Sequence, residues 1–280
     1  MNALNDSLSI SAVVLSHNEA GNLPRCLHAL RDCAEVVVID DGSTDDSPRI
    51  AAECGARVMA HPFSSFADQR NWAMESAGVR NEWVLHLDAD EVMTPAALEE
   101  IRRRLPLLTS GTVGFIPRKV MLGEKWLRFS ADYPVFVPRL LHRQGPRYAM
   151  RGHGEVLASV PGKSVFLDEP LLHYNFSKGW ADWRVRHQRY AVAEAARIRA
   201  GLPRFSLRTL LSADRIARRA AWRALSYCLP ARPTLRFLYA YGIRLGFLDG
   251  SAGLRFCLAM ASYERMIDAS LRKPVEAQAP

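Results

Sequence analysis

The first 116 residues alternate between short apolar runs and segments with helical spacing. Runs rich in β-branched residues predict five buried strands, at Ile10–Leu15, Val36–Ile39, Arg57–Ala60, Trp83–Leu87 and Val113–Ile116. The segments between them predict four helices, at Asn22–Arg31, Ser47–Cys54, Phe66–Ala77 and Pro95–Leu105. Strands that alternate with helices form βαβ units, so we expect an α/β fold with a mostly parallel sheet.

The pattern changes at about residue 117. Residues 117–175 are rich in Gly, Pro, Arg and His, with possible strands at Pro134–Leu141 and Ser164–Leu167. From about residue 180 the spacing is helical, and it predicts two apolar helix faces, formed by Phe237, Tyr241, Leu245 and Leu248 and by Phe256, Met260, Tyr263 and Ile267. We therefore predict an α/β domain over residues 8–175 and a helical region over residues 176–273.

Charge is distributed unevenly along the chain. Residues 1–116 carry 9 basic and 17 acidic residues, whereas residues 117–280 carry 28 basic and 12 acidic ones. An asymmetry of this size predicts an anionic partner for the second half. Arginine-rich amphipathic helices favour an anionic membrane surface or glycolipid. The alternatives are a solvated helical appendage and a nucleic-acid-binding module, and the acidic first half argues against nucleic acid.

The N-terminus and the cysteines indicate a compartment. The start, MNALNDSLSI, lacks the basic and apolar regions of a secretory signal, and no uncharged apolar run reaches about 18 residues. The five cysteines show no CxxC spacing, and we predict that they are buried, reduced thiols: Cys26, Cys33, Cys54, Cys228 and Cys257. We expect a cytoplasmic protein, peripheral at the inner face of the cytoplasmic membrane.

Polar residues collect directly after three of the predicted strands. Ser16, Asn18 and Glu19 follow the first strand, Asp41 follows the second, and an Asp88-Ala89-Asp90-Glu91 motif follows the fourth. Ligands of open α/β sheets bind at the carboxyl ends of the strands. These three clusters are therefore expected to meet in one crevice.

The spacing of Asp88 and Asp90 allows one carboxylate to face a ribose and the other a cation. Mg²⁺ and Mn²⁺ prefer oxygen ligands, and such an ion would neutralise a departing diphosphate. Asp41 is placed to accept hydrogen bonds from a base or a ribose. Each cluster also has a structural alternative, since acidic and hydroxyl residues commonly cap the helix that follows a strand.

Four segments resemble the inverting family 2 glycosyltransferases, which have a Rossmann-like GT-A fold. In the family's order they are ISAVVLSHNEAGNLPRCL, EVVVIDDGSTDDS, FADQRNWAMESA and EWVLHLDADE. Three later segments are similar to bacterial lipopolysaccharide-core β-glucosyltransferases, namely RLLHRQGPRYAMRGHGEVL, LLHYNFSKG and YGIRLGFLDGSAGLRFCLAMASYE. The resemblance implies metal-dependent transfer of a hexose, with UDP-glucose as the expected donor, to a lipopolysaccharide-core or other lipid-linked saccharide. A nucleotidyltransferase is the enzymatic alternative, but SHNEAGNLPR lacks the Gly-rich, Lys-containing loop it would need.

The resemblance also implies roles for individual residues on the donor side. Asp41 would bind the nucleotide base, with Ser16, Asn18 and Glu19 nearby. Asp88 would bind ribose, and Asp90 would bind the metal, joined by His173. Arg70 would lie near the diphosphate or the donor sugar; its alternative is an ordinary helix-surface arginine. The alternative for His173 is a satisfied core histidine.

The catalytic base is expected in the His153-Gly154-Glu155 segment, where the resembling group has a His-Glu motif without the glycine. Direct inversion needs a carboxylate that takes the proton of the acceptor hydroxyl. We predict Glu155 for this role, with Asp132 in reserve. The structural alternative for Glu155 is a surface carboxylate paired with Arg151.

Overall fold

The computed structural model describes residues 7–151, 154–159, 162–201 and 206–273. The chain divides by its internal contacts into two compact units. The first contains the residues up to Trp126 together with Asp132–Lys178, and the second contains Leu127–Ala131 and the chain from Gly179 onward.

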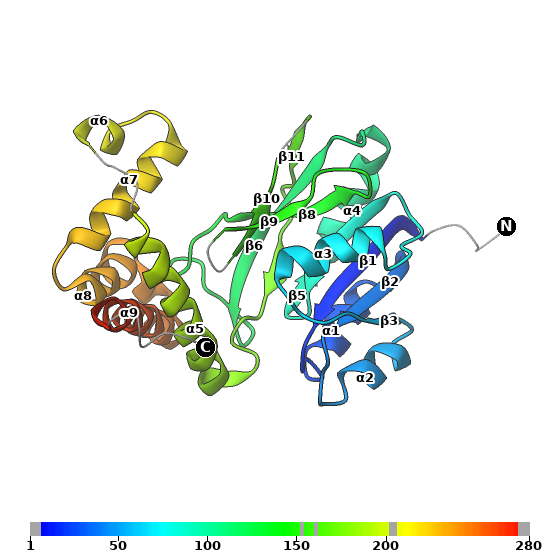
Figure 1. The fold of residues 1–280 in the computed structure, drawn as a ribbon, viewed down its shortest axis with the longest axis horizontal. Coiled ribbons are helices and arrows are strands. Elements are labelled where there is room, and N and C mark those ends of the chain that lie inside the picture. The colour runs from blue at the N-terminus through cyan, green and yellow to red at the C-terminus, as the bar shows by residue number, and fades with distance from the viewer. Residues whose placement is uncertain (1–6, 152–153, 160–161, 202–205, 274–280) are drawn as a thin grey trace. The chain divides into compact units, whose positions relative to one another are not determined.

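The first unit is built on a large mixed sheet (Figure 1). Its strand order is β3-β2-β1-β4-β8-β6-β12-β5. The bounds of these strands are Leu8–Ser16 for β1, Cys33–Asp40 for β2, Arg57–Ala60 for β3, Trp83–Asp88 for β4, Glu91–Met93 for β5, Val113–Leu122 for β6, Phe136–His142 for β8 and Leu171–His173 for β12. Strands β7 (Lys125–Trp126) and β11 (Ser164–Phe166) also pair with β6, while β9 (Tyr148–Arg151) and β10 (Gly154–Leu157) form a separate antiparallel pair.

The five predicted strands of the first 116 residues are all present, but the sheet is mixed rather than mostly parallel. Strands β3, β2, β1 and β4 are parallel to one another, whereas β8 lies antiparallel between β4 and β6. Antiparallel strands need no crossover helix between them. The sequence between β6 and β8 accordingly contains no helix.

The four predicted helices of this unit are confirmed with slightly shorter ends. They are α1 (Leu23–Ala29), α2 (Ser47–Glu53), α3 (Phe66–Glu75) and α4 (Pro95–Arg104), and a short 3₁₀ turn, η1 (Leu105–Leu107), extends α4. Alternate residues of β1 belong to two different core clusters. Ile10, Ala12 and Val14 pack in one cluster with residues of α1 and α4, while Val13 and Leu15 pack in another with residues of α3. Both faces of β1 are thus buried, which explains its continuous apolar run.

The second unit is helical. It contains α5 (Gly179–Arg199), α6 (Leu207–Leu210), α7 (Arg215–Cys228), α8 (Arg232–Phe237), the π-helix η2 (Leu238–Ile243), the 3₁₀-helix η3 (Gly246–Asp249) and α9 (Gly250–Arg272). The predicted face of α9 is confirmed, with Phe256 and Ile267 buried. The predicted continuous face from Phe237 to Leu248 is wrong, because Leu245 has a left-handed φ of +63° and separates η2 from η3.

Two further expectations are settled by the described residues. No helix among them is both long and apolar enough to cross a bilayer. All five cysteines are free thiols, as expected, but Cys54 and Cys228 are exposed, so the prediction of burial holds only for Cys26, Cys33 and Cys257.

Candidate functional site

Three parallel strands end side by side in the first unit. Leu15 of β1 lies opposite Asp88 of β4, and Ser16 of β1 lies opposite Asp40 of β2. The register therefore places the three polar clusters that follow these strands at one edge of the sheet, as the sequence predicts.

A buried ion cluster surrounds Asp88 at the end of β4. Arg70 of α3 donates from Nη2 to Asp88 Oδ1 at 2.6 Å, and from Nε to both carboxylate oxygens of Glu155 at 2.7 and 2.8 Å. The Arg70 side chain is only 1% exposed. The alternative of an ordinary surface arginine is therefore wrong. Glu155, on β10, pairs with Arg70 rather than standing on the open surface, and its side chain is 16% exposed.

Arg139 on β8 completes the cluster and was not identified from the sequence. Its Nη2 donates to Asp88 at 2.9 Å and to Glu91 at 2.7 Å, and its Nη1 donates to Glu155 at 2.8 Å. Glu91 is fully buried and also accepts from the Asp88 amide at 3.2 Å. The sequence did contain a signal for Arg139, because this charged residue lies inside the apolar run of a predicted strand and a buried charge needs partners.

The electrostatics of the cluster keep Asp88 ionised. Burial by itself would raise the pKa of the Asp88 carboxyl, but the guanidinium groups of Arg139 and Arg70 outweigh burial and hold that pKa well below its usual value. Nearby His86 on β4 is fully buried, and its burial lowers the pKa of the imidazole well below the ordinary value. Neutral His86 therefore adds no positive charge beside the two arginines.

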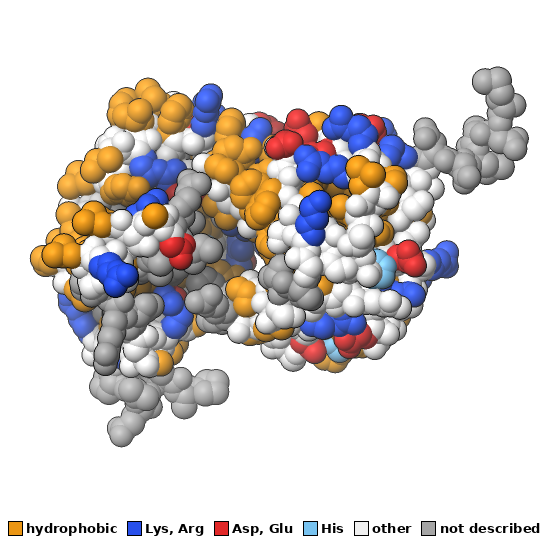
Figure 2. Space-filling view, turned by 90° about the horizontal axis from the view of Figure 1, so that it is seen from above, with side chains coloured by type: hydrophobic (Ala, Val, Ile, Leu, Met, Phe, Trp, Pro, Cys, Tyr) orange, Lys and Arg blue, Asp and Glu red, His pale blue; other side chains and the backbone are white. Residues whose placement is uncertain are grey.

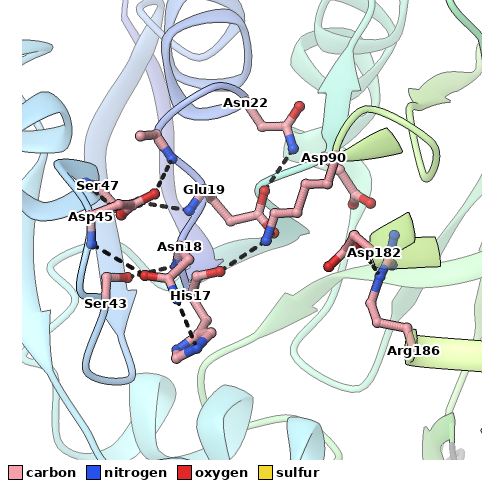
Figure 3. Close-up of polar contacts among 12 residues, drawn as sticks. His17, Asn18, Glu19, Asn22, Ser43, Asp45, Ser47, Asp90, Asp182 and Arg186 are labelled. Atoms are coloured by element: carbon pink, nitrogen blue, oxygen red, sulfur yellow. Dashed lines mark hydrogen bonds and ion pairs between the residues drawn. The ribbon is translucent and has the colours of Figure 1, made fainter. Parts of the chain in front are cut away.

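The loop after β1 is tied to the loop after β2 through Asn18 (Figure 3). The Asn18 side-chain oxygen accepts from the backbone amides of Thr44 at 2.7 Å and Asp45 at 3.3 Å. The backbone amide of Asn18 donates to Ser43 Oγ at 2.8 Å. Asn18 has a left-handed φ of +52°, a conformation that Asn tolerates better than most residues. Asn18 thus holds the two loops together.

Glu19 lies in the same loop and binds Lys178, a residue that was not identified from the sequence. Lys178 Nζ lies 2.6 Å from Glu19 Oε1 and donates to the backbone oxygen of His17 at 3.0 Å. Burial raises the pKa of Glu19 despite this contact. The signal for Lys178 was its place just after β12, in the segment LLHYNFSKG. Ser16 is buried, and its hydroxyl has no hydrogen-bond partner among the described residues.

Asp41 and its neighbour Asp40 have different surroundings. Asp40 shapes the turn by accepting from the amides of Gly42 at 3.1 Å and Ser43 at 2.9 Å. Gly42 has a φ of +89°, which favours glycine at this turn. Asp41 instead contacts Nδ1 of His17, and its side chain is 15% exposed. The Asp41 side chain is thus mostly covered, and only a small part of it stays accessible to a ligand.

Asp90 lies next to His173, the two residues that the resemblance implies as metal ligands. His173 Nε2 is 3.5 Å from Asp90 Oδ2, and the Tyr174 amide donates to the Asp90 backbone oxygen at 2.8 Å. Nδ1 of His173 is buried and has no partner among the described residues. A carboxylate and an imidazole form a donor set that suits a divalent ion whose other ligands are phosphate and water. Among the described residues, no group of three or more His, Cys, Asp or Glu side chains is arranged to hold a metal ion by itself.

Of the residues considered for the catalytic base, the structure describes Glu155 and Asp132. His153 lies outside the described residues, and so does the side chain of Arg151. Asp132 is exposed in the segment between β7 and β8. The structure therefore links Glu155 to Asp88 through Arg70 and Arg139.

Curated glycosyltransferases are similar to part of this chain. A glycosyltransferase of Rickettsia felis is 38% identical over 93 residues, which cover 33% of this chain and 32% of that protein. The lipopolysaccharide core biosynthesis glycosyltransferase LpsC of Rhizobium meliloti is 32% identical over 110 residues, or 38% of each chain. The chain thus spans only about a third of the length of these curated relatives.

Solved structures show weaker likenesses. Residues 1–349 of S. aureus TarS share 13% identity with this chain at a TM-score of 0.44, covering 94% of this chain and 91% of that one. Glucosyl-3-phosphoglycerate synthase of Mycobacterium tuberculosis, solved with Mn²⁺, UDP and glucosyl-3-phosphoglycerate, shares 22% identity at a TM-score of 0.34, covering 41% and 45%. Both scores are too low to support an assignment.

The family model carries the assignment. The model of glycosyl transferase family 2 matches residues 11–158, more than half of the 280-residue chain. This range includes every member of the Asp88 cluster and the loops after β1 and β2. The chain therefore belongs to glycosyltransferase family 2.

Proposed function

We propose that this protein is an inverting hexosyltransferase that takes glucose from UDP-glucose and delivers it to a lipid-linked saccharide such as a lipopolysaccharide core. The observation that carries the proposal is the meeting of three acidic strand ends beside the Arg70–Asp88–Glu155 ion cluster. The likeness to LpsC favours a lipopolysaccharide-core acceptor. We place the enzyme at the inner face of the cytoplasmic membrane, where such acceptors and nucleotide-sugars would meet.

On the donor side, Asp41 binds the nucleotide base in a pocket shaped by Ser16, Asn18 and Glu19. Asp88 accepts from the ribose, for which its 33% exposed side chain leaves room despite the two arginines. Asp90 and His173 would hold a divalent cation, Mg²⁺ or Mn²⁺, which supplies positive charge to the departing diphosphate.

On the acceptor side, Glu155 is the general base. Its Oε1 accepts from both Arg70 and Arg139, whereas its Oε2 accepts from Arg70 alone. Oε2 is therefore the oxygen that takes the proton of the acceptor hydroxyl. The acceptor oxygen bonds to the anomeric carbon while the bond from that carbon to the UDP oxygen breaks. A single displacement of this kind converts an α-linked donor into a β-linked product.

Calorimetry with UDP-glucose tests the donor half of the proposal. We expect binding that strengthens when Mn²⁺ is added and weakens when the cation is chelated. In the Asp90→Ala variant, Mn²⁺ should no longer strengthen binding. Asp32→Ala, at the opposite end of β2, is the matched control and should behave as the parent protein. Absence of any nucleotide-sugar binding, with and without cations, would overturn the proposal.

Product analysis tests the proposed acceptor and the proposed inversion at the anomeric carbon. Membrane extracts from a cell that lacks the enzyme, supplied with UDP-glucose and purified protein, should yield a glucosylated lipid-linked saccharide. NMR of the released saccharide should show a β-anomeric proton. An α-linked product would contradict direct inversion, and transfer only to water-soluble sugars would contradict the acceptor assignment.

A further inference from the structure

The second unit exposes a concentration of large apolar side chains between residues 235 and 258, which we call the apolar surface. Leu238, Ile243, Phe247, Leu248 and Leu258 are all 47% or more exposed, and Ile243 reaches 76%. They come from η2, η3 and the first half of α9, which are consecutive in the chain and pack against one another. Contiguous exposed apolar side chains on a soluble fold mark an interaction site.

The apolar surface is held in place by close packing. A Cβ on Gly253 would lie 2.2 Å from the backbone oxygen of Gly246, and a Cβ on Gly246 would lie 2.5 Å from that of Ala240. Buried Asp249 accepts from the amide of Ser130 at 2.8 Å and from its hydroxyl at 2.7 Å. The turn between η2 and α9 is therefore built to present these side chains outward.

The charge of the same segment identifies the partner. It contains three arginines, Arg236, Arg244 and Arg255, and its one acidic residue is Asp249, which is buried. Figure 2 shows one face of the molecule, seen from above relative to Figure 1, and at the left of this view hydrophobic and Lys or Arg side chains lie together while acidic ones are sparse. Apolar side chains among arginines match a bilayer with anionic headgroups. A second copy of this chain would instead bring like charges together.

We propose that the apolar surface docks on an anionic phospholipid bilayer, with Ile243, Phe247 and Leu248 entering the interfacial layer and exposed Arg255 contacting lipid phosphates. The attachment proposed here is peripheral, through side chains of η2, η3 and α9. The inference deepens the proposed function, because a lipid-linked acceptor is presented at such a surface. The inference rests on the proposed function only for the purpose of the docking, because binding to lipid requires no nucleotide-sugar donor.

Vesicle flotation tests the proposal with the full chain. The protein should float with phosphatidylcholine vesicles that contain phosphatidylglycerol and bind much less to phosphatidylcholine alone. Ile243→Glu and Leu248→Glu should each weaken binding about tenfold or more, because each removes an inserted side chain. Leu107→Glu is the matched control: Leu107 is 81% exposed in the first unit, and its substitution should leave flotation unchanged. Arg255→Gln should weaken binding to the anionic vesicles by roughly fivefold, whereas Arg103→Gln on α4 should not.

The outcomes separate this inference from the proposed function. UDP-glucose binding measured without vesicles should be the same in Ile243→Glu, Leu248→Glu and the parent protein, and their far-UV circular dichroism should also be the same, which shows that the helical unit still folds. If the parent protein floats but binds no nucleotide-sugar, the docking surface stands and the proposed function fails. Unchanged flotation of both glutamate variants would overturn the docking surface. The docking surface would also be overturned if the only effect of the two glutamate substitutions were the loss of a dimer, measured by analytical ultracentrifugation.

Discussion

Arg70 and Glu155 are 85 positions apart in the chain, yet Arg70 Nε donates to both oxygens of the Glu155 carboxylate at 2.7 and 2.8 Å. The same guanidinium reaches Asp88 at 2.6 Å. One planar group therefore fixes the distance between the residue proposed to bind ribose and the residue proposed to act as base. Lysine, with a single nitrogen, could not hold both carboxylates in this way.

Replacing Arg70 should therefore destabilise the fold. Arg70→Leu leaves Asp88 and Glu155 with one arginine in place of two, and we expect the free energy of unfolding to fall by roughly 3 kcal/mol. Urea unfolding followed by circular dichroism measures this change. Arg49→Leu removes an exposed arginine of α2 that pairs with Glu53, and it should barely alter the curve. Equal curves for the two variants would show that the buried pairs contribute little.

Glu155→Gln tests the proposed base. The amide is nearly the same size but cannot take a proton, so kcat for transfer should fall by roughly 10²- to 10⁴-fold. The affinity for UDP-glucose, measured by calorimetry, should change little. Glu75→Gln provides the comparison, since exposed Glu75 pairs with Arg147 in another part of the same unit. Undiminished transfer by Glu155→Gln would assign Glu155 to holding Arg70 and Arg139 instead.

The sequence predicted the strand ends well, because they depend on local order. Short apolar runs followed by acidic residues located Asp41, Asp88 and Asp90, and the parallel register of β1 with β2 and β4 brought their loops together. The burial of Arg70 had a weaker signal. Ala67 and Met74 lie three residues before it and four after it, on the same buried face of α3. The helical pattern alone does not show that this face is covered, so the burial of Arg70 follows only from the packing of α3 on the sheet.

Arg139 could not be located in the site from local order, because its position depends on where β8 pairs. A strand that follows β6 in the chain could have joined an outer edge of the sheet. Instead β8 lies between β4 and β6, which carries Arg139 to the end of β4 and to Asp88. The order of strands in a mixed sheet is set by long-range packing, which periodicity does not report. For the same reason the sequence left open what Glu155 contacts.

Substitution of His173 tests the proposed cation site without an activity assay. His173→Leu should lower the affinity for Mn²⁺ by roughly tenfold or more, because it removes a nitrogen next to Asp90. Electron paramagnetic resonance of free Mn²⁺, titrated with protein and UDP, gives this affinity directly. His28→Leu, on exposed α1 surface, is the control and should bind Mn²⁺ normally. Equal affinities for the two variants would remove His173 from the cation site.

Buried His86 gives the fold a specific dependence on pH. Burial lowers the pKa of its imidazole well below that of the unfolded chain, which is about 6.5. As the pH falls below about 6.5, the imidazole of His86 is protonated in the unfolded state but stays neutral in the folded state. The contribution of His86 to stability is therefore full above that pH and is lost progressively below it. The loss should approach about 1.4 kcal/mol per pH unit. Urea unfolding at several pH values between the two pKa values measures it.

The leucine variant isolates that contribution. His86→Leu has a similar volume and no titrating group, so its unfolding free energy should decline less steeply than that of the parent protein as the pH is lowered. His28→Leu should keep the parent slope, because His28 is exposed. The test compares only the slopes of unfolding free energy against pH. The ring of His86 lies 5.3 Å from that of Tyr148, and losing this packing would lower the unfolding free energy equally at every pH. Parallel curves for His86→Leu and the parent protein would mean that His86 takes up its proton in the folded state, with the two arginines beside it.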